Sequence, residues 1–228
     1  TARSMIFVTP DGERSMNTYL GACVELGPDD VEPAKTDAKV TYFEGYLWDP
    51  PRAKEAIRLA AKLTHEAGGE VAMTLSDPFC VDRYRDEFLD LMRSGTVDIV
   101  FANQHELISL YQTPSFETAL EAIRKDCKLA AVTRSAAGSI VVSGDRTASV
   151  KATKVDQVVD TTGAGDLYAA GFLYGYTMGL EHRLCAELGS LAAGLVIQQI
   201  GPRPRENLFE AAEQAGLLKH LERATHET

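Results

Sequence analysis

A short glycine-rich loop is the part of the chain best suited to chemistry. In residues 158–167, an apolar pair of valines leads into a loop in which Gly163 and Gly165 flank Ala164. We expect the valines to end a strand and a helix to begin at once after the loop. The N-terminus of a helix offers unpaired N–H groups and the positive end of its dipole. Small residues in front of it let an anion approach the backbone, so the pattern predicts an oxyanion or phosphate cradle.

Asp166 falls in the first turn of that predicted helix. A carboxylate there can take the proton from a substrate hydroxyl while the amides hold the phosphoryl group that is attacked. An acidic residue in a first turn is also favoured by the helix dipole alone, so spacing leaves both interpretations open. The loop is not a P-loop, because G-x-x-x-x-G-K-[ST] is absent from the sequence, and it lacks the dinucleotide fingerprint G-x-G-x-x-G.

Residues 160–166, DTTGAGD, resemble the signature of the PfkB carbohydrate kinases, a family that includes ribokinase, fructokinase and adenosine kinase. The resemblance implies that Asp166 is the catalytic base and that the amides of Gly163, Ala164, Gly165 and Asp166 form the anion hole. It further implies ATP as phosphoryl donor, Mg²⁺ as cofactor, and a ribokinase-like three-layer α/β/α fold with a small β lid.

Asn103 and Glu106 follow an apolar strand predicted over residues 97–101 and resemble the N-x-x-E motif of the family. An asparagine with an acidic residue three positions later is also a capping box at a helix start. The resemblance favours a nucleotide-site role for Asn103 and a water-mediated link to Mg²⁺ for Glu106, since Mg²⁺ keeps most of its waters in such sites.

A nucleotide loop is implied at residues 133–138. Thr133 ends a predicted strand, and Gly138 closes a stretch that resembles the T-x-G-x-x-G of the family. Ser135 stands where a glycine is common, which weakens the assignment at that position.

Gly201 resembles the glycine that closes the adenine pocket and a monovalent-cation site in many members. The same resemblance implies that Asp160 and Thr162 contribute to that ion. Arg205 occupies a position where relatives with the ion often have a small hydroxyl residue, so potassium is left open. A plain helix C-cap before a proline is the alternative for Gly201.

Strands alternate with helices along most of the chain, which predicts an α/β fold with a mostly parallel sheet and helices on both faces. The predicted strands are residues 40–43, 71–75, 97–101 and 129–132, with a hairpin of 140–142 and 148–150. The predicted helices are residues 52–67, 81–92, 116–125, 164–178, 182–199 and 207–217, with a further helix through Leu107, Leu110 and Tyr111 after the 97–101 strand. A hairpin with a Pro-Asp-Gly turn opens the chain. We therefore expect residues 1–20 to be part of the lid and residues 21–228 to be the kinase core.

Composition excludes several classes of protein. The net charge of −10 over 228 residues disfavours nucleic-acid binding, which needs a basic face. No apolar stretch reaches the ~20 residues that span a bilayer, and four widely spaced cysteines suggest neither a disulfide framework nor a zinc site. A cytoplasmic protein with no membrane partner is expected. Because the chain opens on Thr1 within an apparent strand, we expect it to be incomplete at its start.

The sequence also carries a pattern that bears on the substrate. Residues 1–22 and 43–49 resemble the lid-to-core passage of bacterial adenosine-kinase-like members, and an apolar hairpin suits a flat base. This favours adenosine as phosphoryl acceptor, giving AMP and ADP. A sugar kinase of the fructokinase or ribokinase type is the alternative, and a non-catalytic nucleotide-binding fragment is a remote one. The oligomeric state is left open.

Overall fold

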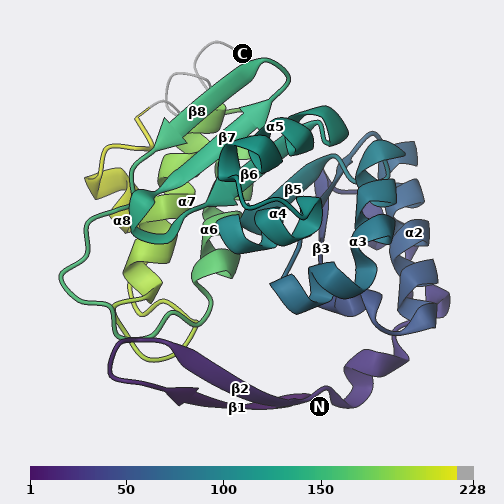
Figure 1. The fold of residues 1–228 in the computed structure, drawn as a ribbon, viewed down its shortest axis with the longest axis horizontal. Helices are drawn as coiled ribbons and strands as arrows, with labels where there is room; N and C mark the ends of the chain where they lie inside the picture. Colours follow the sequence, from purple (N-terminus) through teal and green to yellow (C-terminus); the bar gives the residue numbers. More distant parts are fainter. Residues whose placement is uncertain (220–228) are drawn as a thin grey trace. The chain divides into compact units, whose positions relative to one another are not determined.

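The computed structural model describes residues 1–219 (Figure 1). By packing, the chain divides into two compact units. The first unit consists of residues 1–3, 18–133 and 142–147, and the second of residues 4–17, 134–141 and those from 148 onward. This division does not test the predicted boundary at residue 20, which stays a prediction. No helix among the described residues is long and apolar enough to cross a membrane.

Four short parallel strands frame the first unit: β3 (Val40–Glu44), β4 (Glu70–Thr74), β5 (Ile99–Asn103) and β6 (Leu129–Thr133). Strands β4 to β6 are almost wholly buried, as their continuous apolar runs predict for a parallel sheet. In the ladders, Val71 lies beside Thr41 and Val100 lies beside Met73. Because strand order follows chain order, right-handed crossovers place the connecting helices on one face of these strands.

The connecting helices are α2 (Pro51–Glu66), α3 (Pro78–Arg93), α4 (Gln104–Tyr111) and α5 (Phe116–Asp126), and the short α1 (Pro33–Thr36) precedes β3. Their starts are set locally. Helices α2 and α3 begin on a proline, whose missing N–H costs nothing at the first helical position. The side chains of Asp77, Asn103 and Ser115 accept hydrogen bonds from the first-turn amides of α3, α4 and α5.

Trp48 anchors the turn that follows β3. Its ring is fully buried, and its Nε1 donates to Glu87 Oε2 at 2.8 Å. Lys54 Nζ donates to both oxygens of Glu87 at 2.8 Å and lies 5.6 Å from the centroid of the tryptophan ring. The short 3-10 helix η3 (Gly45–Trp48) is thereby fixed to α2 and α3 at the carboxyl end of β3.

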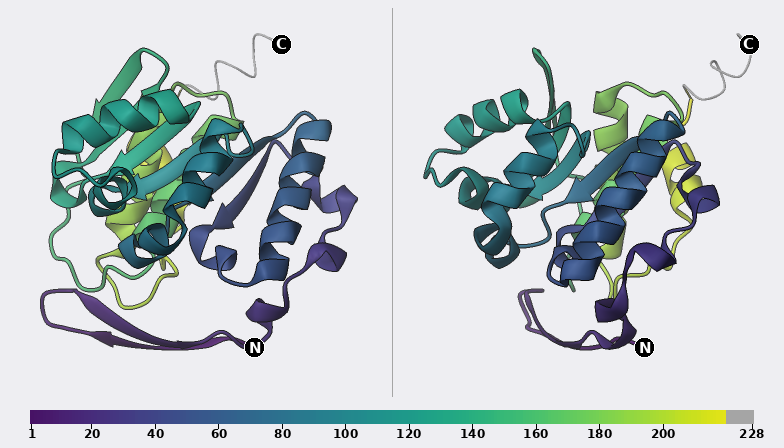
Figure 2. Two further views of the ribbon diagram at one scale, coloured as in Figure 1. Left: turned by 45° about the vertical axis from the view of Figure 1, so that its right-hand side comes forward. Right: turned by 90° about the vertical axis from the view of Figure 1, so that its right-hand side faces the viewer.

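Helices α6 (Ala164–Thr177) and α7 (His182–Val196) form the body of the second unit and lie side by side in both views of Figure 2. Glycines allow their backbones to touch. A Cβ atom on Gly171 would lie 2.6 Å from the carbonyl oxygen of Leu188, and one on Gly189 would lie 2.6 Å from that of Tyr168. The C-terminal helix α8 (Leu208–Gln214) packs Ala212 against Leu188 of α7.

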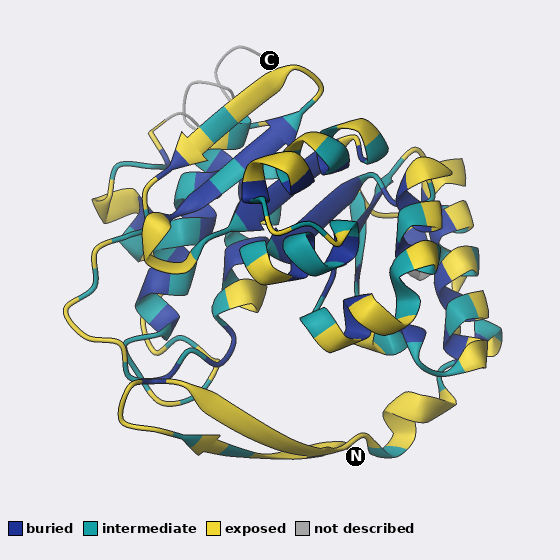
Figure 3. Cartoon of the chain, viewed as in Figure 1, coloured by how far each residue is buried: buried dark blue, intermediate teal, exposed yellow. Residues whose placement is uncertain are grey.

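Strands β1 (Arg3–Val8) and β2 (Arg14–Tyr19) form the predicted hairpin as a separate two-stranded sheet. Its turn is closed by the Thr9 N–H, which donates to the carbonyl of Glu13 at 2.8 Å. Gly12 takes the positive φ of 82° that such a turn requires. Most of the hairpin is exposed (Figure 3), including the apolar side chains of Met5 and Phe7.

Strands β7 (Ser139–Ser143) and β8 (Arg146–Val150) complete the main sheet, whose order is β3-β4-β5-β6-β7-β8. Only Gly144 and Asp145 join them, so they run antiparallel. The α/β class and the mostly parallel sheet are therefore confirmed, and the other predicted strands and helices are found within a few residues of their expected ends.

One predicted strand is wrong. Val158 and Val159 belong to no strand. The N–H of Val159 donates to the carbonyl of Ile197 at 2.8 Å, and the N–H of Asp160 reaches the same carbonyl at 3.3 Å. These amides are satisfied by the end of α7, so they need no partner strand. Helix α7 itself ends at Val196 and not at the predicted residue 199.

The backbone contact between α6 and α7 can be tested by Gly189→Ala. The added Cβ would meet a carbonyl oxygen that cannot swing aside, so the helices must separate. We expect the free energy of unfolding to fall by about 1–3 kcal/mol. Gly165→Ala is the matched control, since its Cβ would meet no atom within 4 Å. Urea unfolding followed by circular dichroism measures both variants, and wild-type stability for Gly189→Ala would contradict the contact.

Candidate active site

The loop before α6 depends on Gly163. This residue is the N-cap of the helix and adopts a left-handed conformation, with φ of 80°. A Cβ atom there would lie 2.7 Å from the Cβ of Pro202 and 3.1 Å from its Cα. Any larger residue would therefore be strained in its backbone and crowded by its neighbour. The glycine is required both by its conformation and by the close approach of the segment after α7.

Free amides gather at this helix start. Within residues 1–219, the N–H groups of Gly163, Gly165 and Asp166 donate to no acceptor, whereas that of Ala164 donates to the Thr161 carbonyl at 3.2 Å. These amides lie at the positive end of the α6 dipole. Small residues surround them, so an anion can reach the backbone directly. The anion cradle stays a prediction, and the N–H of Ala164 already has an acceptor in Thr161.

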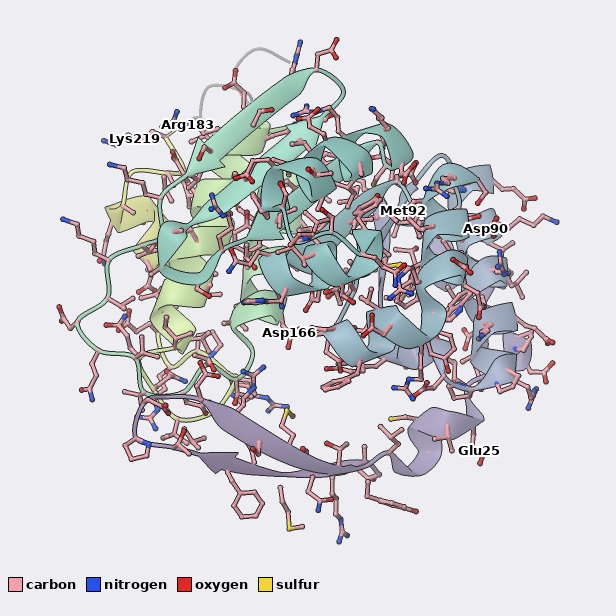
Figure 4. All side chains as sticks on the ribbon, viewed as in Figure 1. Glu25, Asp90, Met92, Asp166, Arg183 and Lys219 are labelled. Atoms are coloured by element: carbon pink, nitrogen blue, oxygen red, sulfur yellow. The ribbon has the colours of Figure 1, made fainter. Side chains whose placement is uncertain are left out.

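Asp166 projects from the first turn of α6, where Figure 4 labels its side chain. The residue is exposed, as is the neighbouring Gly165. A solvent-accessible carboxylate next to free amides can accept a proton from a hydroxyl whose oxygen attacks an anion held by those amides. The observed arrangement is therefore compatible with the predicted base.

Asp160 is buried at the start of the loop and ties the loop to the segment that follows α7. Its Oδ1 accepts the N–H of Thr162 at 2.9 Å and the hydroxyl of Thr162 at 2.6 Å, and its Oδ2 accepts the N–H of Gly201 at 2.8 Å. Burial acts to raise the pKa of this carboxyl, but the donated hydrogen bonds and the charge of Arg14 outweigh it and hold the pKa below its ordinary value.

Gly201 is not the C-cap of α7, because Ile197 has that position. Its φ is 92°, and its N–H belongs to the Asp160 network. Arg205 donates its backbone N–H to Gln199 Oε1 at 3.0 Å, which closes the intervening loop. A monovalent cation at Asp160 and Thr162 stays a prediction, since it would have to share a carboxylate that already accepts three hydrogen bonds.

Arg14 is a residue that the sequence alone did not single out. Its Nη1 donates to the hydroxyl of Thr161 at 2.9 Å, and the same hydroxyl donates to the carbonyl of Gly12 at 3.1 Å. The turn of the β1–β2 hairpin thus rests on the glycine-rich loop and brings a guanidinium beside it. The available signal was an arginine two residues after a Pro-Asp-Gly turn, which gives no indication of its distant partner.

The predicted nucleotide loop is tightly shaped. Ser135 adopts a left-handed φ of 48°, which explains why a glycine would suit this position. Gly138 has φ of 90°, and a Cβ there would lie 2.0 Å from the carbonyl oxygen of Val150. The N–H of Arg134 donates to the Gly138 carbonyl at 2.7 Å, which closes the turn. Thr133 is the last residue of β6, as predicted.

Asn103 and Glu106 form a complete capping box at the start of α4. Asn103 Oδ1 accepts the amides of His105 and Glu106, and Glu106 Oε2 accepts the Asn103 N–H at 2.8 Å. Burial raises the pKa of Glu106 to about 7; the Asn103 hydrogen bond opposes the shift, and the carboxylate of Asp77 adds to it. A buried carboxyl facing a second acid would be relieved by a cation, so the donor set also suits a hydrated Mg²⁺.

The structure brings together one group of the predicted residues within the second unit. Hydrogen bonds join Asp160 with Thr162 and Gly201, and Gly163 packs against Pro202. Ala164, Gly165 and Asp166 follow along α6. Ser135 and Gly138 belong to the same unit, whereas Asn103, Glu106 and Thr133 belong to the first unit at the ends of β5 and β6.

Comparison with known proteins identifies the family. The model of the pfkB family carbohydrate kinases matches residues 1–207, which include the glycine-rich loop. The chain belongs to this family. A solved pfkB-family structure, the adenosine kinase from Sinorhizobium meliloti, is 68% identical with a TM-score of 0.93; the match covers 94% of this chain and 66% of that one.

Two further relatives are similar over most of the chain. A solved structure from Rhizobium etli CFN 42, named as a probable sugar kinase, is 68% identical with a TM-score of 0.94, over 95% of this chain and 66% of that one. The adenosine kinase of Saccharomyces cerevisiae is 31% identical over 83% of this chain and 59% of its own length. The chain thus spans somewhat less than two thirds of the length of these pfkB-family relatives.

Asp160→Asn tests the buried carboxylate of the pfkB-family loop. The amide keeps the shape but turns one acceptor into a donor that faces other donors, so we expect a loss of about 1–3 kcal/mol in the free energy of unfolding at pH 7. Because the native pKa of Asp160 is lowered, its contribution is present above the unfolded pKa and is lost as the pH falls through the native pKa. The difference between wild type and variant in urea unfolding should therefore shrink below about pH 4. A difference independent of pH would contradict the ionised assignment.

Proposed function

We propose that this chain carries the catalytic and nucleotide-binding residues of an ATP-dependent phosphotransferase, which transfers the γ-phosphoryl group to a hydroxymethyl group of adenosine. The observation that carries the proposal is the exposed Asp166 beside the free amides of Gly163 and Gly165 at the start of α6. Family membership supports it, because the DTTGAGD residues lie within the matched range.

The reaction follows from what each group can hold. The amides of the loop would bind the oxygens of the phosphoryl group in transfer, where negative charge gathers. Asp166 would accept the proton of the acceptor hydroxyl as its oxygen bonds to the γ-phosphorus and the bond to the β-phosphate oxygen breaks, which leaves ADP. Arg14, held at Thr161, adds a positive charge beside the same loop.

The nucleotide and its metal would be bound by residues outside the glycine-rich loop as well. The proposed nucleotide-binding residues are Asn103, Thr133, Ser135, Gly138 and Gly201. Ala164 would contribute to the anion hole with the other loop amides. Glu106 would hold Mg²⁺ through water, and the bound ion would neutralise charge on the phosphates. Because the pKa of Glu106 is raised to about 7, its side chain becomes a carboxylate as the pH rises through that value. Cation binding should strengthen over the same range.

Adenosine is preferred as acceptor for two reasons. The 68% identity extends over 94% of the chain to a protein that is an adenosine kinase, and the yeast relative has the same name. The β1–β2 hairpin also exposes Met5, Phe7 and Met16, apolar side chains that suit a flat base. A sugar acceptor such as fructose or ribose is the second candidate, favoured by the equally similar protein from Rhizobium etli.

The base assignment is tested by Asp166→Asn. The substitution keeps the size of the side chain and the helix start while it removes the proton acceptor. We expect normal folding, similar ATP affinity and a kcat lower by roughly 10²–10⁴-fold in the full-length protein. Steady-state kinetics with calorimetric ATP binding measures both quantities. A folded variant with more than ~10% of the wild-type kcat would show that Asp166 is not the base.

The acceptor is tested by ATP turnover against a panel of nucleosides and sugars. We expect a kcat/KM for adenosine at least ~100-fold above that for fructose, because a base contact worth a few kcal/mol is gained. Equal turnover of fructose, or no turnover of adenosine, would favour the sugar kinase. ATP binding with no turnover of any acceptor would favour the non-catalytic alternative.

A further inference from the structure

Tyr168 carries a buried hydroxyl that the proposed reaction does not use. Its Oη donates to Ser139 Oγ at 2.8 Å, and the two residues are only 4% and 2% exposed. Burial raises the pKa of the phenol to about 12, so it remains a donor at physiological pH. A buried hydroxyl that lost this partner would keep the full cost of its desolvation, so the pair has one favoured arrangement.

The hydrogen bond joins two parts of the proposed site. Tyr168 follows Asp166 by two residues on α6, and Ser139 directly follows Gly138, the last residue of the nucleotide loop (residues 134–138). The end of the loop is held in place, because Gly138 is packed against the Val150 carbonyl. The bond therefore connects the start of β7, which bears the loop, with the turn that bears the base.

The tyrosine ring has no room to find another partner. A Cβ on Gly189 would lie 3.0 Å from Tyr168 Cδ2, so α7 packs closely on the ring. The ring also lies 6.3 Å from that of Phe172, centroid to centroid. A phenylalanine at position 168 would fill the same space. What the tyrosine adds is the single hydrogen bond to Ser139.

We propose that Tyr168 is a positioning residue that keeps the nucleotide loop in register with the first turn of α6, and so aligns the phosphoryl donor with Asp166. The inference rests on the proposed function. Transfer between bound groups is sensitive to their alignment, and a displacement of about 1 Å can cost about 10²-fold in rate. Tyr168 itself touches neither of the reacting groups and acts through Ser139.

Tyr168→Phe in the full-length protein tests this inference. We expect kcat to fall about 10-fold and the KM for ATP to rise, with an unchanged KM for the acceptor and an intact fold by circular dichroism. A residue that only stabilised the fold would lower the melting temperature and leave kcat and both KM values at 25 °C unchanged, which would overturn the proposal. Tyr174→Phe is the matched control, because Tyr174 lies on the same helix with 40% of its surface exposed.

Ser139→Ala removes the same hydrogen bond from the loop side. This variant tests the inference if Tyr168→Phe does not fold. We expect a similar fall in kcat, and a double variant no slower than the slower single one, because both changes break one contact. Losses that multiply in the double variant would overturn the proposal. A wild-type protein that transfers phosphate to no acceptor would overturn the proposed function, whereas an active wild type with unaffected Tyr168→Phe kinetics would overturn this inference alone.

Discussion

The buried carboxylate of Asp160 is the interaction on which the site depends. It lies at the junction of the glycine-rich loop and the segment that follows α7, and it accepts hydrogen bonds from Thr162 and Gly201. Its own N–H returns to the carbonyl of Ile197. A buried charge is tolerated only when donors surround it, so the two segments must meet whenever the charge is buried. This condition fixes where α6 begins relative to the end of α7.

Close backbone packing gives the loop its shape. Pro202 leaves no space for a side chain on Gly163, and Gly189 brings the backbone of α7 against Tyr168 of α6. The free amides at the start of α6 are therefore held by neighbours that cannot move independently. Preorganised donors of this kind stabilise developing charge without reorganising during the reaction. The small residues of these helices thus allow the close packing, and in the proposed function they also shape the site.

The carboxyl ends of the parallel strands hold a second electrostatic feature. Asn103 and Glu106 satisfy the start of α4 as a capping box, and Asp77 caps α3. Burial raises the pKa of Glu106, and the charge of Asp77 adds to that rise. Asn103 thus ends β5 and caps α4, while Asp77 and Glu106 place carboxyl groups at the starts of α3 and α4. The capping and metal interpretations of the motif are compatible, because a capping carboxylate keeps lone pairs that can accept hydrogen bonds from the waters of a cation.

The sequence by itself determined the features that depend on neighbouring residues. Ser115 marked a helix start and DTTGAGD marked both the family and the loop, because caps and glycine conformations are local. Only the tertiary structure decided that Val158 and Val159 form no strand, since the amide of Val159 donates to Ile197, at a helix end almost forty residues away. It likewise decided the partner of Arg14, which lies 147 residues further along the chain. Local patterns specify what a segment can form, whereas long-range hydrogen bonds depend on the path of the folded chain and leave no signal at either partner.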